Sequence, residues 1–515
     1  MANKNTRTKN SALSLVTGIG GQLLNEALRF ITRTVFIYTL GKMFLGINGL
    51  FAEIMTMLSL TNLGVGTAII YRLYKPIAEN DEHQVRILLK FYKKAYQAIG
   101  AVILVLGLCL LPFLEVLIKD YDRLGSIGLN AKVVYLLFLG QSVVSYFFFA
   151  YRNCVFAADQ KQYVVNSVNM VTSIVTAIVQ IAVLYLWHDF IIYLLVGIID
   201  GVLKSLVIAV LAYKQYPNFF KKESDSLPAE EVKSMFKDCS ALVLYKMNGV
   251  VQKSTGNFIL SAFIGLAIVG MYSNYFVIYA ALRQLSNQLF TALRGSMGNL
   301  FASKASIEDK YRFFEIMNFL TIIIFGTIAV FFCVNINELV FCWIGNDYII
   351  PQPFPLLLGI EVLIMGLALN LNQIRNVTGL FRQMWTRPLL SMTTNLVVTL
   401  IAVQFIGIYA IPLGYIISVT TTNLIADPIV IHKSGFQNLK SVSSYYKRNI
   451  KYILVLILGG GTSWFINSYV LTNPSWLSFI FHTFVSIIVT NLLLIVFFHN
   501  RMEFKYLTMK VIGRT

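Results

Sequence analysis

The stretch LSLVTGIGGQLLNEALRFITRTVFIYTL, residues 13–40, is long and apolar enough to cross a bilayer as a helix, yet it contains three charged residues. Glu26, Arg29 and Arg33 follow one another at spacings of three and four, so a helix places all three on one side. Each such charge at the membrane centre costs about 2.5–3.5 kcal/mol on insertion scales. One glutamate cannot neutralise two arginines, which favours a hydrated, functional cavity on this side over a structural ion pair.

The composition is that of an integral membrane protein. Of the 515 residues, 57% are hydrophobic and 13% are charged, whereas soluble domains carry about 25% charged residues. The formal net charge of +18 is explained by Lys and Arg that flank membrane spans. No basic stripe with base-stacking aromatic residues is found, so we expect no nucleic-acid partner.

Hydrophobic stretches recur along the whole chain and predict an all-α polytopic membrane protein with fourteen transmembrane helices. Two of them are ambiguous: 241–264 is unusually polar, and the junction near Ile408–Pro412 is compatible with one re-entrant segment in place of two spans. The predicted spans are 13–40, 48–71, 95–118, 131–156, 163–187, 190–213, 241–264, 268–293, 313–336, 354–378, 388–407, 410–432, 452–471 and 476–499.

The distribution of Lys and Arg predicts the orientation of these spans. With the N-terminus in the cytoplasm, 32 of the 42 Lys and Arg fall in cytoplasmic loops and tails. Only Lys42, Lys119 and Arg123 fall in outer loops. This asymmetry follows the positive-inside rule, so we expect a multi-pass protein of the cytoplasmic membrane with both termini in the cytoplasm.

An internal repeat relates the two halves of the chain. A shift of 224 residues superposes four pairs in a nearly gapless register: Arg29 on Lys253, Arg33 on Asn257, Gly41 on Gly265 and Gly46 on Gly270. Because the repeat unit contains six spans, an even number, a pseudo-twofold axis along the membrane normal should relate the halves. The predicted parts are an N-terminal lobe (1–213), a cytoplasmic linker with a surface helix (214–240), a C-terminal lobe (241–432) and two further spans with a cytoplasmic tail (433–515).

Cations inside the first, seventh and eighth spans predict an anion site. They would line a cleft between the two halves and are Arg29, Arg33, Lys246, Lys253 and Arg283. Arginine offers bidentate hydrogen bonds to phosphate and lysine a point charge, so a diphosphate headgroup is the natural ligand. The alternative is a structural network in which Glu53 and Glu361 neutralise these cations. Lys204, four residues after Asp200, is interpreted as half of a local ion pair.

Further polar residues are candidates for the cavity wall or for ion coupling. Glu361 shares a helical line with Asn372 and Arg375, and a buried glutamate can bind a proton near neutral pH. We therefore expect Glu361 to be a candidate for H⁺ or Na⁺ coupling. Glu26 and Asn257 are further candidate polar groups of the cavity.

Motifs of the common enzyme classes are absent from the sequence. It contains no HExxH, GxSxG, Walker A or dinucleotide-binding motif, and its five histidines lack metal-ligand spacing. We therefore expect no catalytic residues, no metal and no bound cofactor. Any energy that the protein uses would have to come from an ion gradient or a partner.

Four segments carry a resemblance to bacterial polysaccharide flippases. They are RTVFIYTLG (33–41), LGINGLF (45–51), LGVGTAII (63–70) and LYKPIA (73–78). In these the chain is similar to the oligosaccharide-lipid translocases of the multidrug/oligosaccharidyl-lipid/polysaccharide exporter superfamily. The resemblance extends over essentially the whole chain. It implies two six-helix lobes around a cavity and alternating-access transport of undecaprenyl-diphosphate-linked repeat units for O-antigen, capsule or exopolysaccharide assembly.

Two departures from that family pattern remove carboxylates. Similar sequences often have an Asp after the Ser-Thr of the seventh span, where this chain has Gly256 and Asn257, and a Glu before the Leu-Gly of the second span, where it has Asn62. Ion coupling is therefore not carried over from the family. The resemblance implies a polyprenyl-linked glycan, the lipid bilayer and a polysaccharide polymerase with its export machinery as partners. A lipid II flippase, a cation-coupled multidrug exporter and, from another class, a membrane polysaccharide polymerase stay open as alternatives.

Overall fold

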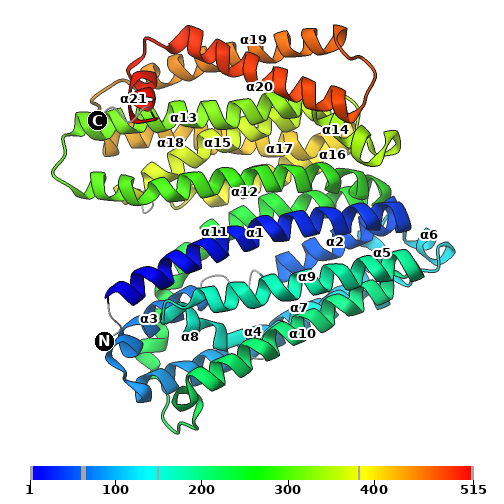
Figure 1. Ribbon diagram of the computed structural model, residues 1–515, viewed down its shortest axis with the longest axis vertical. Coiled ribbons are helices and arrows are strands. Elements are labelled where there is room, and N and C mark those ends of the chain that lie inside the picture. Colours follow the sequence, from blue (N-terminus) through cyan, green and yellow to red (C-terminus); the bar gives the residue numbers. More distant parts are fainter. Residues whose placement is uncertain (1–3, 60–64, 148–149, 381–382, 512–515) are drawn as a thin grey trace. The chain divides into compact units, whose positions relative to one another are not determined.

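Helices form every regular element in the residues that the computed structural model describes, which are 4–59, 65–147, 150–380 and 383–511 (Figure 1). The chain divides into two compact units, Met1–Gly270 (unit 1) and Met271–Thr515 (unit 2). Within the described ranges, nine helical stretches are long and apolar enough to cross a membrane. The predicted class, an all-α polytopic membrane protein, is confirmed, whereas the total of fourteen spans stays a prediction.

Unit 1 contains the first seven predicted spans. α9 lies between α1 and α10, α10 also contacts α7, and α2 packs against α11. Its longer helices are α1 (Lys4–Leu40), α2 (Lys42–Leu58), α3 (Val65–Glu79), α4 (Glu82–Leu110), α7 (Ala131–Phe147), α9 (Gln162–Trp187), α10 (Phe190–Gln215) and α11 (Ala229–Phe263), and its short ones are α5 (Leu114–Leu117), α6 (Tyr121–Ser126) and α8 (Asn153–Ala158).

Unit 2 is built around α13, which packs against α15, α19, α20 and α21. The region after α16 alternates between α-helical and π-helical turns, a feature frequent at functional sites. Its helices are α12 (Leu266–Ala302, of which the first turn belongs to unit 1), α13 (Ile307–Val334), α14 (Ile336–Ile344), α15 (Phe354–Thr378), α16 (Arg387–Ile406), α17 (Ala410–Val419), α18 (Ala426–Val430), α19 (Val442–Tyr469), α20 (Trp476–Phe498) and α21 (Met502–Val511).

The helices refine several predicted boundaries. α11 is one helix of 35 residues, so the predicted surface helix at 229–237 and the seventh span are continuous. α16 and α17 pack against each other after a short 3₁₀ turn at Gly407–Tyr409, which agrees with two segments there. The predicted span 48–71 falls on α2 and α3, and its residues 60–64 lie outside the described part.

The internal repeat is visible in where the helices begin. α2 begins at Lys42 and α12 at Leu266, 224 residues later; α4 begins at Glu82 and α13 at Ile307, 225 residues later. α9 and α16 begin at Gln162 and Arg387, again 225 residues apart. The N-caps also correspond, because Asp81 caps α4 and Ser306 caps α13, each accepting a hydrogen bond from a backbone N–H.

Two repeat-related glycines meet at the crossing of α2 with the first turn of α12. A Cβ on Gly46 would lie 2.0 Å from the carbonyl oxygen of Leu266, and one on Gly270 would lie 2.3 Å from that of Lys42. Lys42 and Leu266 are themselves a pair at the offset of 224. Each glycine therefore packs against the carbonyl four residues before its repeat counterpart.

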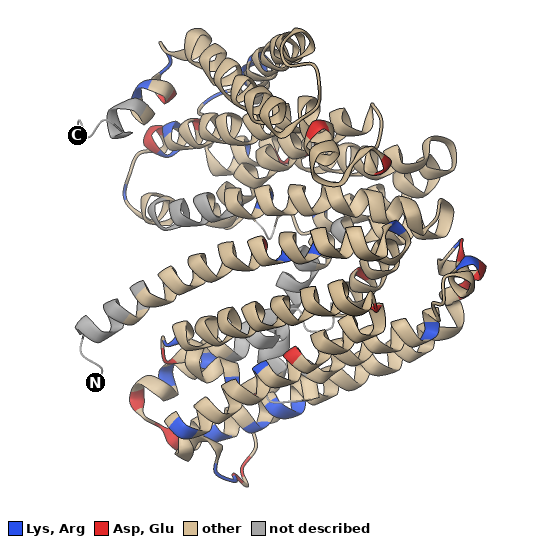
Figure 2. Ribbon diagram, turned by 45° about the vertical axis from the view of Figure 1, so that its right-hand side comes forward, with Lys and Arg blue, Asp and Glu red and all other residues tan. Residues whose placement is uncertain are grey.

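Some of the long helices contain no Lys, Arg, Asp or Glu, and α9 and α20 are examples. Figure 2 shows α9 without a Lys, Arg, Asp or Glu along its length, in agreement with its sequence. Neither α1 nor α11 is among the nine apolar stretches. These two helices contain Glu26, Arg29 and Arg33, and Lys246 and Lys253, respectively.

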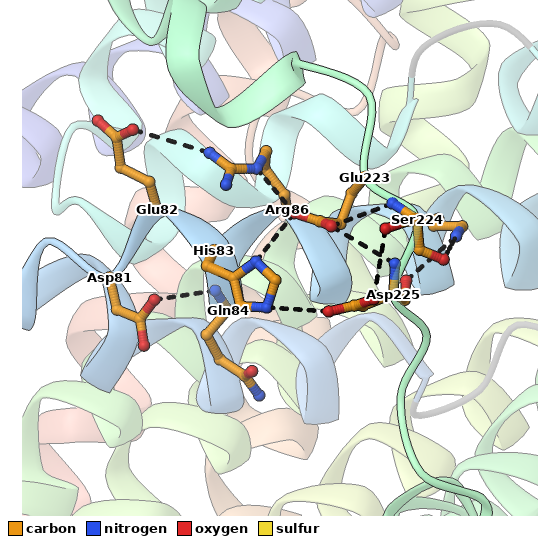
Figure 3. Close-up of polar contacts among 9 residues, drawn as sticks. Asp81, Glu82, His83, Gln84, Arg86, Glu223, Ser224 and Asp225 are labelled. Carbon is orange, nitrogen blue, oxygen red and sulfur yellow. Dashed lines mark hydrogen bonds and ion pairs between the residues drawn. The ribbon is translucent and has the colours of Figure 1, made fainter.

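The segment between α10 and α11 is fastened to the start of α4 (Figure 3). Glu223 accepts a hydrogen bond from Arg86 Nε at 3.0 Å and lies 3.0 Å from His83 Nδ1, while the other ring nitrogen of His83 lies 3.3 Å from Asp225. Lys90 donates to the backbone carbonyls of Ser224 and Asp225. The hydrogen bond from Arg86 lowers the pKa of the Glu223 carboxyl from 4.5 to about 2. Because each ring nitrogen faces a different carboxylate, the imidazole bridges two acids and this cluster has the geometry of ion pairing.

Candidate functional site

The charged side of α1 is arranged as its spacing predicts. Arg29 and Glu26 form an ion pair one turn apart, with 3.5 Å between Nη1 and Oε1. The Arg29 side chain is nevertheless 66% exposed within the chain, and Arg33, one turn further on, is half-buried. Thr32, between them, is buried. α1 thus presents two guanidinium groups from adjacent turns.

These two arginines line a polar pocket inside unit 1. The pocket has a volume of about 710 Å³ and is bounded by α1, α2, α7, α9 and α10. This volume lies within the usual range of small-molecule sites, about 300–1,000 Å³. The α1 wall contributes Asn25, Arg29, Thr32 and Arg33, and α2 adds Asn48.

The opposite wall is formed by two helical stripes. On α9 the stripe is Asn169, Ser173, Thr176 and Gln180, and on α10 it is Tyr193, Gly197, Asp200 and Lys204. Both follow the spacing i, i+4, i+7, i+11, which places four residues on one face of a helix. Since the other faces of α9 and α10 are apolar, the pocket is the environment in which these polar groups avoid lipid.

Hydrogen bonds and ion pairs order this wall. Lys204 Nζ lies 2.6 Å from Asp200 Oδ2 and 3.4 Å from Ser173 Oγ. The Gln180 amide donates to the backbone carbonyl of Tyr193 at 3.4 Å. Tyr193 lines the same pocket as Arg29 and Arg33, and its ring packs edge-on against Phe36 of α1, with 5.3 Å between the ring centroids.

The sequence predicted one ion pair of this wall but did not predict that the wall lines a pocket. The ion pair between Asp200 and Lys204 is confirmed, but its position in the pocket with Arg29 and Arg33 was not predicted. The signal was present, because polar residues recur at helical spacing within two otherwise apolar spans. The two stripes form one wall because α9 and α10 pack against each other, and the sequence does not show that packing.

In unit 2, the charge of Glu361 on α15 acts on Arg283 of α12. The two helices meet where the Tyr279 hydroxyl of α12 lies 3.1 Å from the Met365 sulfur of α15. The alternative interpretation of the cations needs an ion pair, and the influence of Glu361 on Arg283 is weaker than that. Arg29 and Arg33, by contrast, share a pocket in unit 1.

A buried ion pair in unit 2 includes one predicted residue. Arg375 Nη1 on α15 lies 3.6 Å from Asp427 Oδ2 on α18, and Asp427 is fully buried. Asp427 lies between the two π-helical segments and was not among the predicted residues. Asn372, one turn before Arg375, is half-buried. Leaving one member of such a pair alone costs about 3–5 kcal/mol, which explains why both remain.

The remaining predicted residues lie on α11. The side chains of Lys246 and Lys253 lie outside the described residues, so the cleft of five cations between the halves stays a prediction. Asn257, the repeat counterpart of Arg33, is buried and donates to the backbone carbonyl of Gly49 on α2 at 3.5 Å. This amide therefore contributes to packing between α11 and α2.

A large apolar cavity is also found in unit 2. It has a volume of about 920 Å³ and lies among α13, α15 and α19. Its lining includes Val330, Leu363, Leu456 and Trp464, with few polar groups. Its lining is apolar, whereas that of the pocket in unit 1 is partly polar and charged, so this cavity suits a hydrocarbon chain.

Sequence and structure comparisons place this geometry in a family. The family model described as "Polysaccharide biosynthesis protein" matches residues 12–294, more than half of the chain. The chain belongs to the polysaccharide biosynthesis protein family. The resemblance stated from the sequence is thereby confirmed, and every residue of the unit 1 pocket lies within the matched range of this polysaccharide biosynthesis protein. No curated protein sequence matches the chain.

Solved structures of transporters share the fold. A structure titled lipid II flippase MurJ, in an inward closed conformation, has a TM-score of 0.64 at 13% identity and covers 94% of this chain and 99% of its own. An inward-facing multidrug resistance MATE family transporter of the MOP superfamily has a TM-score of 0.56 at 12% identity, with 81% and 96% covered. A Vibrio cholerae MATE transporter has a TM-score of 0.50 at 14% identity, with 84% and 99% covered. These likenesses confirm the fold of a MurJ- and MATE-like transporter.

Proposed function

We propose that this polysaccharide biosynthesis protein is a flippase for polyprenyl-diphosphate-linked oligosaccharides. It would move undecaprenyl-diphosphate-linked repeat units across the cytoplasmic membrane by alternating access, for assembly of O-antigen, capsule or exopolysaccharide. The observation that carries the proposal is the polar pocket in which Arg29 and Arg33 stand together within the family-matched range. Two guanidinium groups one turn apart can each make bidentate hydrogen bonds to a phosphate.

The pocket in unit 1 suits the headgroup of such a lipid. A diphosphate cannot cross hydrocarbon unaided, and this pocket offers it hydration and positive charge. The polyprenyl tail would stay in the lipid of the bilayer, which is itself apolar. A polymerase and its export machinery would consume the product at the outer face.

Coupling to H⁺ or Na⁺ is part of this proposal, since the sequence contains no ATPase motif. Glu361 is the candidate residue, because it lies beside Arg283 and Tyr279 on helices of unit 2. A proton or Na⁺ bound at Glu361 would weaken its attraction to Arg283. Transport into vesicles with and without an imposed pH or Na⁺ gradient, in the wild type and in Glu361→Gln, tests this step.

The decisive experiment for the flippase is a charge series at Arg33. Arg33→Ala should reduce surface polysaccharide at equal protein level, and Arg33→Lys should restore only part of it, because lysine keeps the charge and loses the bidentate geometry. Arg123→Ala, in the exposed short helix α6, is the matched control and should leave export unchanged. Undiminished export in Arg33→Ala would refute the anion site.

The second candidate function is a lipid II flippase, favoured by the structural likeness to MurJ. Both substrates carry a polyprenyl diphosphate, so the charge series does not separate them. Complementation does: the chain should restore surface polysaccharide in cells that lack their repeat-unit flippase and fail to rescue cells depleted of their lipid II flippase. A multidrug exporter for cations is disfavoured, because the one carboxylate lining the unit 1 pocket in its described residues, Asp200, is held by Lys204.

A further inference from the structure

The pocket in unit 1 has two walls of different chemistry. The α1 wall carries Arg29 and Arg33, which suit an anion. The wall of α9 and α10 carries amides, hydroxyls and the ion pair of Asp200 with Lys204. A carboxylate repels phosphate, so the second wall is not an extension of the anion site. The wall of α9 and α10 therefore suits a part of the ligand other than its phosphates.

The groups of the second wall match sugar hydroxyls. A hydroxyl donates one hydrogen bond and accepts up to two, and an amide side chain such as Gln180 or Asn169 offers both a donor and an acceptor. Asp200 adds acceptor positions and Lys204 donors, while their mutual contact at 2.6 Å leaves the pair without net charge. A neutral, hydroxyl-rich ligand is favoured by such a surface.

The wall is also held in place. Gln180 donates to the Tyr193 carbonyl, and Lys204 contacts both Asp200 and Ser173. Gly197 has no side chain at the point where Gln141 from α7 approaches, since a Cβ there would lie 2.7 Å from Gln141 Nε2. Pre-positioned hydrogen-bonding groups lose little entropy on binding and discriminate between ligands that differ by one hydroxyl.

We propose that the wall of Gln141, Gln180, Asp200 and Lys204 binds the sugar attached directly to the diphosphate. These four residues line the same pocket as the two arginines, so the sugar lies beside the phosphates, as their covalent bond requires. The pocket is then selective for the first sugar, whereas the other sugars of the glycan do not contact this site. This inference rests on the proposed function and adds a specificity site to it.

Binding to the purified full chain in lipid nanodiscs tests the inference with three probes: undecaprenyl diphosphate, undecaprenyl-diphosphate-glucose and undecaprenyl-diphosphate-N-acetylglucosamine. Gln180→Ala and Asp200→Asn should weaken the better-bound sugar-bearing probe about tenfold or more and leave the bare diphosphate within about twofold. Arg33→Ala should weaken all three. Gln404→Ala, which removes an exposed amide on α16, is the matched control. Thermal unfolding of each variant verifies that it is folded.

The outcomes separate the two hypotheses. Equal loss of the bare and sugar-bearing probes in Gln180→Ala, or no loss of either, overturns the sugar wall and leaves the flippase standing. Wild-type protein that binds none of the three probes overturns the flippase and the sugar wall together. Gly197→Ala gives an independent check, because displacing Gln141 should change the preference between glucose and N-acetylglucosamine without changing the affinity for the bare diphosphate.

Discussion

Gly46 and Gly270 are the residues on which the crossing of α2 with the start of α12 depends. Each leaves room for a backbone carbonyl of the other helix, at 2.0 and 2.3 Å from where a Cβ would stand. Backbone cannot move aside as the end of a side chain can. Gly46→Ala and Gly270→Ala should therefore each lower the stability by about 1–3 kcal/mol, seen as a lower Tm of the purified protein.

Gly249→Ala is the control for this pair. Gly249 also lies within a helix, α11, but nothing stands within 4 Å of the position of its Cβ. Alanine there should be neutral or stabilising by up to about 1 kcal/mol, because of its higher helix propensity. Equal Tm values for all three variants would contradict the close crossing.

The polar residues differ in how far their spacing determined their role. The pairs of Glu26 with Arg29 and of Asp200 with Lys204 were predictable, because partners three or four residues apart meet on any helix. The pair of Arg375 with Asp427 was not predictable, since 52 residues and two helices separate its members. Long-range partners depend on which helices pack together, and periodicity does not contain that information.

At the scale of elements, the docking of the linker on α4 is testable. Removal of the guanidinium in Arg86→Ala should let the pKa of Glu223 rise from about 2 toward 4.5 and should speed hydrogen exchange of residues 221–228. Lys94→Ala, an exposed lysine on the same helix, is the control and should leave that exchange unchanged.

The pH dependence of this dock follows from the same carboxyl. Its folded pKa is depressed, so its contribution is complete above about pH 4.5 and is lost as the pH falls toward 2. In the wild type we expect the contribution of Glu223 to be constant between pH 7 and pH 5. In Arg86→Ala this contribution should be smaller throughout the range, because the folded pKa then lies closer to 4.5. Identical exchange of 221–228 in wild type and Arg86→Ala across this range would contradict the role given to Arg86.

For the whole molecule, the orientation in the membrane is the prediction to test. In a cysteine-free background, Arg123→Cys should react with a membrane-impermeant maleimide in intact cells, because its loop is expected outside. Lys222→Cys, in the linker, should react only after permeabilisation. Both side chains are exposed, so access to water does not distinguish them. The opposite pattern would invert the topology.

The sequence by itself determined the class of the protein, most of its helices and its repeat. These depend on local properties: the length of apolar stretches, and a register of 224 residues that the helix starts follow to within one residue. It also singled out Arg29 and Arg33, because a charged residue inside an apolar stretch can be recognised from the sequence alone. Family membership followed from the segments between residues 33 and 78 and was confirmed by comparison.

Only the tertiary structure decided what surrounds those charges. Packing of α9 between α1 and α10 brought the stripes of Gln180 and Asp200 opposite the arginines. The fold of unit 2 likewise gave Arg375 on α15 its carboxylate partner, Asp427 on α18. A helix places its own side chains at fixed angles, but which face meets which neighbour is settled by the packing of many helices at once. For this reason the charged side of residues 13–40 was predictable as a site, and the wall that faces it was not.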